Sequence, residues 1–224
     1  MMKKRTIGKY DLCLFMPETQ TDTIIYIHLD EARALEIWDR LSEPKPVLAA
    51  IGGADWNRDL SPWSAERVFK NGEDFTGGGR EHLDFILNSV IPEAEEDFTP
   101  KKRVVAGYSL GGLFALWASF QTDAFDYIMT ASGSMWFDGF LDYINSHTPQ
   151  KAERVYFSLG DREKKTGNPR MKTIEDATLT AVETMKNYGA KTYFEFNAGG
   201  HFDNVPDRIA RGINRLISEE NLWK

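Results

Sequence analysis

The sequence predicts an α/β fold in which a mostly parallel sheet is covered by helices on both faces. Short runs rich in β-branched and aromatic residues alternate with segments of helical periodicity almost from end to end. Near the middle, residues 104–115 have the pattern of an apolar strand, a glycine-rich turn and the start of a helix. The 224 residues are 42% hydrophobic and contain no linker-like stretch, so we expect 1–224 to form one domain.

The first half of the chain is predicted to supply one edge of this sheet. Residues 11–16 and 23–29 are expected to pair as an antiparallel hairpin, because the turn-forming residues 17–22 join them. Residues 47–51 form a continuous apolar run that is typical of a buried strand. This strand ends at two glycines, and a long loop rich in polar and aromatic residues follows it.

Helical periodicity begins at residues 32–41, where Leu35, Trp38 and Leu41 fall on one face and are expected to be buried. From there on, strands and helices alternate. The remaining predicted strands are 103–107, 127–131, 154–159 and 191–196, and the remaining predicted helices are 83–91, 111–120, 174–188 and a last one with Ile209, Ile213, Leu216 and Ile217 on one side.

Charge and cysteine content exclude several classes of function. Lysine and arginine number 27 against 34 acidic residues, a net charge of -7, so no nucleic-acid or anionic-membrane surface is expected. The one cysteine, Cys13, cannot form an intramolecular disulfide and is expected to be a small core residue. No pair of histidines has the spacing of metal ligands, so we expect neither a metal nor an organic cofactor.

The start of the chain lacks the pattern of a secretion signal. Basic residues at 3–5 are followed by Thr6, Gly8, Lys9 and Asp11 rather than by an apolar core. The sequence also contains no apolar run long enough to span a membrane. These features predict a cytoplasmic protein with a small-molecule partner, and they leave its oligomeric state open.

The strand-turn-helix segment contains the pattern G-x-S-x-G, which presents a nucleophilic serine in α/β-hydrolases. Ser109 is therefore the predicted nucleophile, held in a strained turn with its hydroxyl outward. Side chains at 107 and 111 are expected to collide with neighbouring backbone, which explains the glycines there. Gly112 is expected to let the following helix pack close to the sheet.

A serine hydroxyl needs a general base, and the chain offers four histidines. His28 ends a predicted strand ahead of the serine, His82 lies in a helical segment, and His147 follows a helix in a polar stretch. Only His201 follows a late strand on a glycine-rich loop, at the carboxyl edge of the sheet where open α/β sheets bind ligands. We therefore predict that His201 is the base.

The acid that orients this base should lie between the serine and the histidine, on a loop after a strand. The loop after 154–159 offers two carboxylates, Asp161 and Glu163. We favour Glu163, because Asp161 follows a glycine and suits a turn-shaping role. The spacing leaves Asp161 open as the acid, and both carboxylates could also belong to a solvated loop.

The negative charge that develops on a substrate oxygen needs backbone N–H donors. Leu110, directly after the serine, would supply one of them. Gly53 or Ala54, after the strand 47–51, would supply the other, although these glycines could also be only a turn that ends the strand.

Aromatic and basic residues are candidates for the substrate pocket. Trp136 follows a predicted strand at its carboxyl end and is the best candidate for a pocket wall, and Trp63, Tyr108 and Arg58 are further candidates. We also expect several basic side chains at the mouth of the site, namely Arg58, Arg80, Arg162 and Lys164.

Four segments, at 58–63, 77–80, 107–112 and 199–202, resemble the esterase D and enterochelin-esterase-like branch of the α/β-hydrolases. The resemblance covers most of the chain from about residue 44 onward and implies an α/β-hydrolase fold with little or no cap. It implies a cofactor-free serine esterase that acts on siderophore lactones, acylated sugars or similar esters. It also implies that Ser109 is the nucleophile, His201 the base and Glu163 the acid. Tyr108 departs from the family pattern, where many members have His or Gln.

These observations together predict a serine carboxylic-ester hydrolase. Two alternatives stay open. An acyltransferase would use the same triad with an alcohol in place of water, and a non-catalytic binding protein could retain the hydrolase scaffold.

Overall fold

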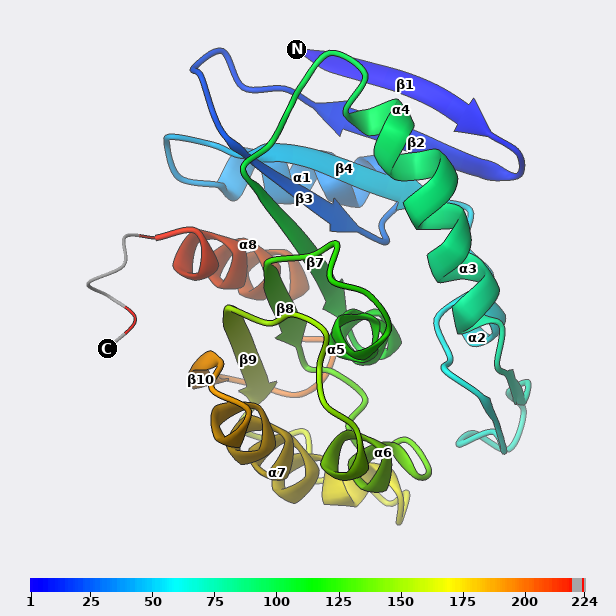
Figure 1. Cartoon of the computed structure of the whole chain (residues 1–224). Helices are drawn as coiled ribbons and strands as arrows, with labels where there is room; N and C mark the ends of the chain where they lie inside the picture. The colour runs from blue at the N-terminus through cyan, green and yellow to red at the C-terminus, as the bar shows by residue number, and fades with distance from the viewer. Residues whose placement is uncertain (219–222, 224) are drawn as a thin grey trace.

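The computed structural model describes residues 1–218 and 223, and its centre is an eight-stranded sheet (Figure 1). The strands lie in the order β1-β2-β4-β3-β7-β8-β9-β10. The β1–β2 and β2–β4 pairs are antiparallel and the other neighbouring pairs are parallel, which confirms the predicted fold class. These strands are β1 (Met2–Ile7), β2 (Tyr10–Phe15), β3 (Thr23–Ile27), β4 (Val47–Gly52), β7 (Lys102–Tyr108), β8 (Tyr127–Ala131), β9 (Arg154–Gly160) and β10 (Lys191–Asn197).

The predicted hairpin of 11–16 with 23–29 is wrong. Strand β2 pairs with β1 and β4, whereas β3 lies parallel between β4 and β7. The actual hairpin turns at Gly8, whose φ is 61°, and joins β2 to the edge strand β1. Strand β1 is polar and largely exposed, as edge strands often are, so it lacks the apolar alternation by which a strand is recognised in a sequence.

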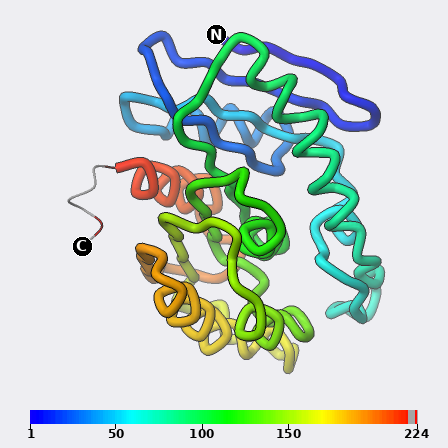
Figure 2. Tube along the Cα trace, in the orientation of Figure 1, coloured from blue at the N-terminus to red at the C-terminus, as the bar shows by residue number. Residues whose placement is uncertain are grey.

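Two layers of helices cover the sheet. Helices α1 (Glu31–Arg40) and α8 (Val205–Leu216) pack on one face with their own core cluster. On the opposite face, the helices pack over a second core cluster. Figure 2 shows one of these helices, α7 (Ile174–Asn187, orange), at the far end of the molecule from the blue N-terminal hairpin. The helices of this second face are α3 (Gly79–Phe85), which continues through the π-helical turn η1 (Ile86–Val90) into α4 (Ile91–Ala94), α5 (Leu110–Gln121), α6 (Phe140–Ser146) and α7 (Ile174–Asn187).

The remaining short elements lie in the loops: α2 (Trp56–Asp59) and the two-stranded ribbon of β5 (Ser64–Ala65) and β6 (Phe75–Thr76) follow β4, and the 3-10 turn η2 (Met171–Thr173) precedes α7. Of the helices in the described residues, none combines the length and apolar character needed to cross a membrane.

The buried face of α1 differs from the predicted one. Ala34 and Ile37 are buried, whereas Leu35 is 47% exposed and Trp38 is only partly buried. Both 34-37-41 and 35-38-41 have helical spacing, so periodicity within one short helix does not decide which face packs. Contact with α8 and β4 decides it.

Helix α5 lies directly against the centre of the sheet, and its residues from Leu110 to Phe120 are all buried. A Cβ atom at Gly107 would lie 2.0 Å from the carbonyl oxygen of Gly111, and one at Gly112 would lie 2.7 Å from Oγ1 of Thr130. Both positions therefore require glycine. Gly111 does not, because a Cβ there would meet only the Trp56 and Leu60 side chains, at 3.6 Å and 3.9 Å. The expected collision at 111 is thus wrong, the one at 107 is as predicted, and Gly112 lets α5 pack close to the sheet, as predicted.

This difference gives a matched pair of variants. Gly111→Ala and Gly112→Ala add the same methyl group to the same helix and gain the same helix propensity. Because only the methyl group at 112 would be overpacked, Gly112→Ala should have a free energy of unfolding about 1–3 kcal/mol below that of Gly111→Ala. Urea unfolding followed by circular dichroism measures both values, and equal stabilities would contradict the proposed close packing.

Candidate active site

Ser109 occupies the sharp turn between β7 and α5. Its φ of 57° and ψ of -124° lie in a region that L-residues rarely adopt, and this strain is typical of a nucleophile elbow. The backbone around the turn is fixed by hydrogen bonds from Ser109 N to Ala131 O at 3.1 Å and from Ser134 N to Ser109 O at 3.0 Å. The half-buried serine side chain is thereby held at the carboxyl edge of the sheet.

The structure brings the three predicted triad residues together in one hydrogen-bonded chain. His201 Nε2 lies 3.0 Å from Ser109 Oγ, and His201 Nδ1 lies 2.8 Å from Glu163 Oε2. Ser109 follows β7, Glu163 follows β9 and His201 follows β10, so three parallel strands bring these residues to the same edge. Distances and order match those that a serine, a general base and an orienting acid require.

Asp161, the other candidate acid, has a structural contact. Its Oδ1 accepts a hydrogen bond from Gly199 N at 2.9 Å, and this bond joins the β9 loop to the loop that carries His201. The described structure therefore places Glu163, and not Asp161, against the His201 ring.

The Glu163 carboxylate is buried, with its side chain 3% exposed, and is well supplied with donors. Oε1 accepts hydrogen bonds from Ser132 Oγ at 2.7 Å, Gly160 N at 2.7 Å and Arg208 Nη1 at 3.1 Å. Burial by itself raises the pKa of Glu163, but the hydrogen bonds from His201, Ser132 and Gly160 outweigh it and hold the pKa below its ordinary value. The carboxylate is thus ionised at neutral pH.

Arg208, which the sequence analysis missed, connects the loops of the site. It is 2% exposed and comes from α8. Besides Glu163, its guanidinium donates to Tyr108 Oη at 3.2 Å and to the carbonyl oxygen of Gly200 at 2.8 Å. Tyr108 Oη in turn donates to the carbonyl oxygen of His201. In the sequence, Arg208 is a charged residue next to the apolar positions of an amphipathic helix. Many ordinary helices have a charged residue where the apolar face meets the polar face, so this signal does not single out Arg208.

Two cavities meet at Ser109. The large cavity has a volume of about 730 Å³, and the small cavity has a volume of about 120 Å³. The residues of the large cavity that concern the site are Gly53, Ala54, Trp56, Tyr108, Ser109 and His201. Those of the small cavity are Trp56, Phe75, Ser109, Leu110, Ser134 and Trp136. The three predicted oxyanion donors, Leu110, Gly53 and Ala54, therefore border the space next to the serine.

The predicted pocket residues divide into two groups. Trp136 lines the small cavity and Tyr108 the large one, in the region where the sequence placed them. Trp63 lines neither; it stacks among aromatic rings and donates from Nε1 to Asp138 O at 2.9 Å. Arg58 also lines neither, because it pairs with Asp59 and Glu81. Sequence reasoning could not anticipate these local ion pairs.

The other predicted basic residues of the mouth also pair elsewhere and line neither cavity. Arg80 bonds Asp84, Arg162 bonds Asp203 and Lys164 bonds Glu175. None of the four basic residues expected at the mouth therefore lines either cavity.

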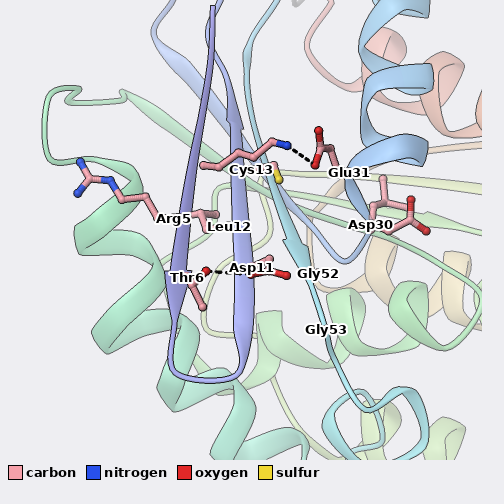
Figure 3. Close-up of a pocket in the computed structure, with 11 residues that line it drawn as sticks. Arg5, Thr6, Asp11, Leu12, Cys13, Asp30, Glu31, Gly52 and Gly53 are labelled. Atoms are coloured by element: carbon pink, nitrogen blue, oxygen red, sulfur yellow. Dashed lines mark hydrogen bonds and ion pairs between the residues drawn. The ribbon is translucent and has the colours of Figure 1, made fainter.

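A third hollow, of about 360 Å³, lies beside β1 and β2 (Figure 3). Its polar side chains already have partners: Lys4 pairs with Glu31 at 2.6 Å, and Thr6 Oγ1 donates to Asp11 Oδ1 at 3.0 Å. Arg5 pairs with Glu93 and Glu96. Cys13 lies at its wall, and burial raises the pKa of the thiol, which disfavours the nucleophilic thiolate. Within residues 1–218 and 223, no group of three His, Cys, Asp or Glu side chains is arranged to hold a metal ion.

The sequence matches a known protein family, and the fold matches solved structures. The profile of a family described as "Putative esterase" matches residues 23–204. Similar solved structures include the siderophore hydrolase EstA from Aspergillus nidulans, with 19% identity, a TM-score of 0.69 and coverage of 95% of this chain and 92% of that chain. The BES protein from Bacillus cereus has 19% identity, a TM-score of 0.65 and coverage of 96% and 93%.

The enterobactin and salmochelin hydrolase IroE has 14% identity, a TM-score of 0.64 and coverage of 99% of this chain and 93% of that chain. At these identities the likeness concerns the fold. No curated protein matches the sequence closely enough to count as a relative.

Beside the large cavity lies a buried chain of hydrogen bonds that ends at His28. Hydrogen bonds from Tyr10 and Asp55 N outweigh burial and lower the pKa of Asp59, so this carboxylate is ionised and accepts from Tyr10 Oη at 2.9 Å. The Tyr10 oxygen can then accept from His82 Nδ1 at 3.2 Å, which leaves His82 Nε2 to accept from His28 Nε2 at 2.8 Å. Both histidines are neutral in this arrangement.

The buried histidines predict a loss of stability in acid. Burial lowers the pKa of His82 to about 4 from 6.5. Between pH 6.5 and 4, the unfolded chain therefore binds a proton at His82 that the folded protein does not bind. Stability should therefore fall between pH 6.5 and 4, by about 3 kcal/mol from this group. Denaturant unfolding across this range should show a shallower pH dependence for His82→Phe.

The exposed His147 offers a control for that experiment. His147→Gln should reproduce the pH dependence of the unaltered protein. If His82→Phe gave the same curve as His147→Gln, the buried pair would not be the source of the acid sensitivity.

Proposed function

The chain belongs to the Putative esterase family, as its sequence resemblance predicted, and from that premise we propose that it is a serine carboxylic-ester hydrolase. The observation that carries the proposal is the continuous chain Ser109–His201–Glu163, with contacts of 3.0 Å and 2.8 Å. We assign Ser109 as nucleophile, His201 as general base and Glu163 as the acid that orients it.

In the first step, Ser109 Oγ attacks the ester carbonyl carbon while His201 Nε2 takes the serine proton. The ionised Glu163 accepts from His201 Nδ1 and stabilises the positive charge that forms on the imidazole ring. The strained turn at Ser109 keeps the hydroxyl in place, so little reorganisation is needed to reach the attacking geometry.

The tetrahedral intermediate has a negative oxygen, for which we propose backbone donors. Leu110 N–H follows the nucleophile at the first turn of α5, where helical N–H groups have no intrahelical acceptor. Gly53 has a φ of 77°, which turns the chain after β4, and with Ala54 it borders the large cavity beside Ser109. One N–H from this turn would complete the oxyanion hole.

Collapse of the intermediate transfers the His201 proton to the alkoxy oxygen and releases the alcohol. Water then enters, loses its proton to His201 and attacks the acyl carbon, and the returning proton restores Ser109. No metal or organic cofactor takes part in this sequence. The substrate is a small or medium-sized ester, in keeping with the siderophore hydrolases among the similar structures.

An activated serine can be tested with a fluorophosphonate probe. The probe should label Ser109, and labelling should abolish hydrolysis of p-nitrophenyl acetate in proportion to the modified fraction, because both need the same activated oxygen. Ser109→Ala should remain folded and lose both labelling and turnover. Hydrolysis at an unchanged rate by Ser109→Ala would contradict the proposed nucleophile.

Substituting each of the two carboxylates of the β9 loop in turn shows which of them is the acid. Glu163→Gln should lower kcat by about 1,000-fold or more, because the amide no longer stabilises the charged imidazole ring or fixes its tautomer. Asp161→Asn should retain most of the activity, since the amide oxygen can still accept from Gly199 N. Steady-state kinetics on the two purified variants measures the ranking, and the reverse order would transfer the role to Asp161.

A further inference from the structure

Ser109 lies between two cavities of unequal size. The large cavity, of about 730 Å³, and the small cavity, of about 120 Å³, both include Ser109 in their walls. Trp56 borders both and forms a wall common to the two. His201 lines only the large cavity, whereas Leu110 lines only the small one. The two halves of an ester bound at Ser109 would therefore occupy very different spaces.

The position of the base decides which half occupies which cavity. His201 Nε2 must deliver a proton to the alkoxy oxygen when the alcohol leaves, so that oxygen has to lie within hydrogen-bond reach of the ring. Because His201 borders the large cavity, the alcohol extends into that cavity. The acyl group then extends to the other side, along Leu110 and toward Trp136 in the small cavity.

We infer, on the basis of the proposed esterase function, that this protein hydrolyses esters of a short acyl group with a large alcohol. The small cavity has about one sixth of the volume of the large cavity, 120 Å³ against 730 Å³, so the acyl side of the site offers the smaller space. Trp56, Phe75 and Trp136 supply its aromatic walls. The large cavity is within the usual range of sites for drug-sized ligands.

The walls of the large cavity indicate the character of the alcohol. Ile37, Val205 and Ile209 supply an apolar floor from α1 and α8. Arg33 and Glu36 supply charged groups on α1 at the same cavity. An alcohol with an apolar body and polar substituents would match both kinds of surface.

The reaction on such an ester is balanced with water as the only co-reactant. Ser109 Oγ forms a bond to the acyl carbon, the bond from that carbon to the alkoxy oxygen breaks, and the proton from Ser109 leaves on the alcohol through His201. Departure of the large alcohol empties the large cavity on the His201 side. Water can then reach His201 and the acyl carbon from that side, which releases a short carboxylic acid.

A pair of isomeric esters tests the assignment directly. Heptyl acetate and methyl octanoate have the same formula and similar primary-alcohol leaving groups, but the long chain lies on opposite sides of the ester. We expect kcat/KM to be about 100-fold or more higher for heptyl acetate, because the octanoyl chain overfills the small cavity. Acid release in a pH-stat measures both, with alkaline hydrolysis of the same pair as the correction for intrinsic reactivity.

The outcomes separate this inference from the proposed function. Equal rates, or a preference for methyl octanoate, in a protein whose Ser109 reacts with the fluorophosphonate probe would overturn the assignment of the cavities and leave the esterase proposal standing. Loss of both reactions from a folded protein would overturn the esterase proposal, and with it the inference. A preference for heptyl acetate that disappears in Ser109→Ala would support both.

Two variants test the cavity walls with a pair of esters that share one leaving group, p-nitrophenol, and differ only in the acyl group. Trp136→Ala enlarges only the small cavity and should raise the ratio of kcat/KM for p-nitrophenyl octanoate over p-nitrophenyl acetate by about 10-fold or more. Phe202→Ala, at an exposed wall of the large cavity, should leave this ratio unchanged. An equal change in both variants would contradict the assignment, and if Trp136→Ala does not fold, the isomeric ester pair decides alone.

Discussion

The close approach of α5 to the centre of the sheet is the constraint on which the site depends. Gly107 and Gly112 leave no room for a Cβ, so α5 lies directly on β7 and β8, with its residues from Leu110 to Phe120 all buried. A wider separation would let the connecting turn relax. The unusual backbone at Ser109 is therefore held by burial of the entire helix, and the strain of one residue is small beside the apolar surface that α5 removes from water.

A buried charge cluster holds Glu163 and His201, the other two residues of the proposed triad, beside that turn. Most residues of the loops after β9 and β10 are exposed or only partly buried, yet Arg208 bonds Glu163 in one loop and Gly200 O in the other. Asp161 adds a second link through Gly199 N. Because a buried ion is costly unless its hydrogen bonds are satisfied, the Arg208–Glu163 pair favours the one arrangement of these loops in which each charge has its partners.

The sequence was informative wherever a residue acts through its immediate neighbours in the chain. Most parallel strands, the turn at Ser109 and the order serine, acid, histidine follow from local patterns and strand ends. The ion pairs of Arg80 with Asp84 and of Lys164 with Glu175 are local contacts. The other failures share a different cause: the pairing of β2 with β4, the buried face of α1 and the ion pairs of Arg58 with Glu81 and of Arg162 with Asp203 depend on partners distant in sequence. Arg208 was missed for the same reason, since its partners lie between 8 and 100 residues away.

Helix α8 and the residues just before it contribute to both the proposed active site and the large cavity. His201 lies just before it, Arg208 comes from its first turn, and Ile209 lines the large cavity, as His201 does. In the proposed mechanism, the segment that would deliver the proton to a leaving alcohol is thus continuous with the floor that would bind this alcohol. Since α8 packs on β7, β8, β9 and α1, a change in that packing would move the base, the acid's partner and the cavity wall together. If the proposed function holds, catalytic geometry and alcohol specificity are therefore coupled through the core on this face of the sheet.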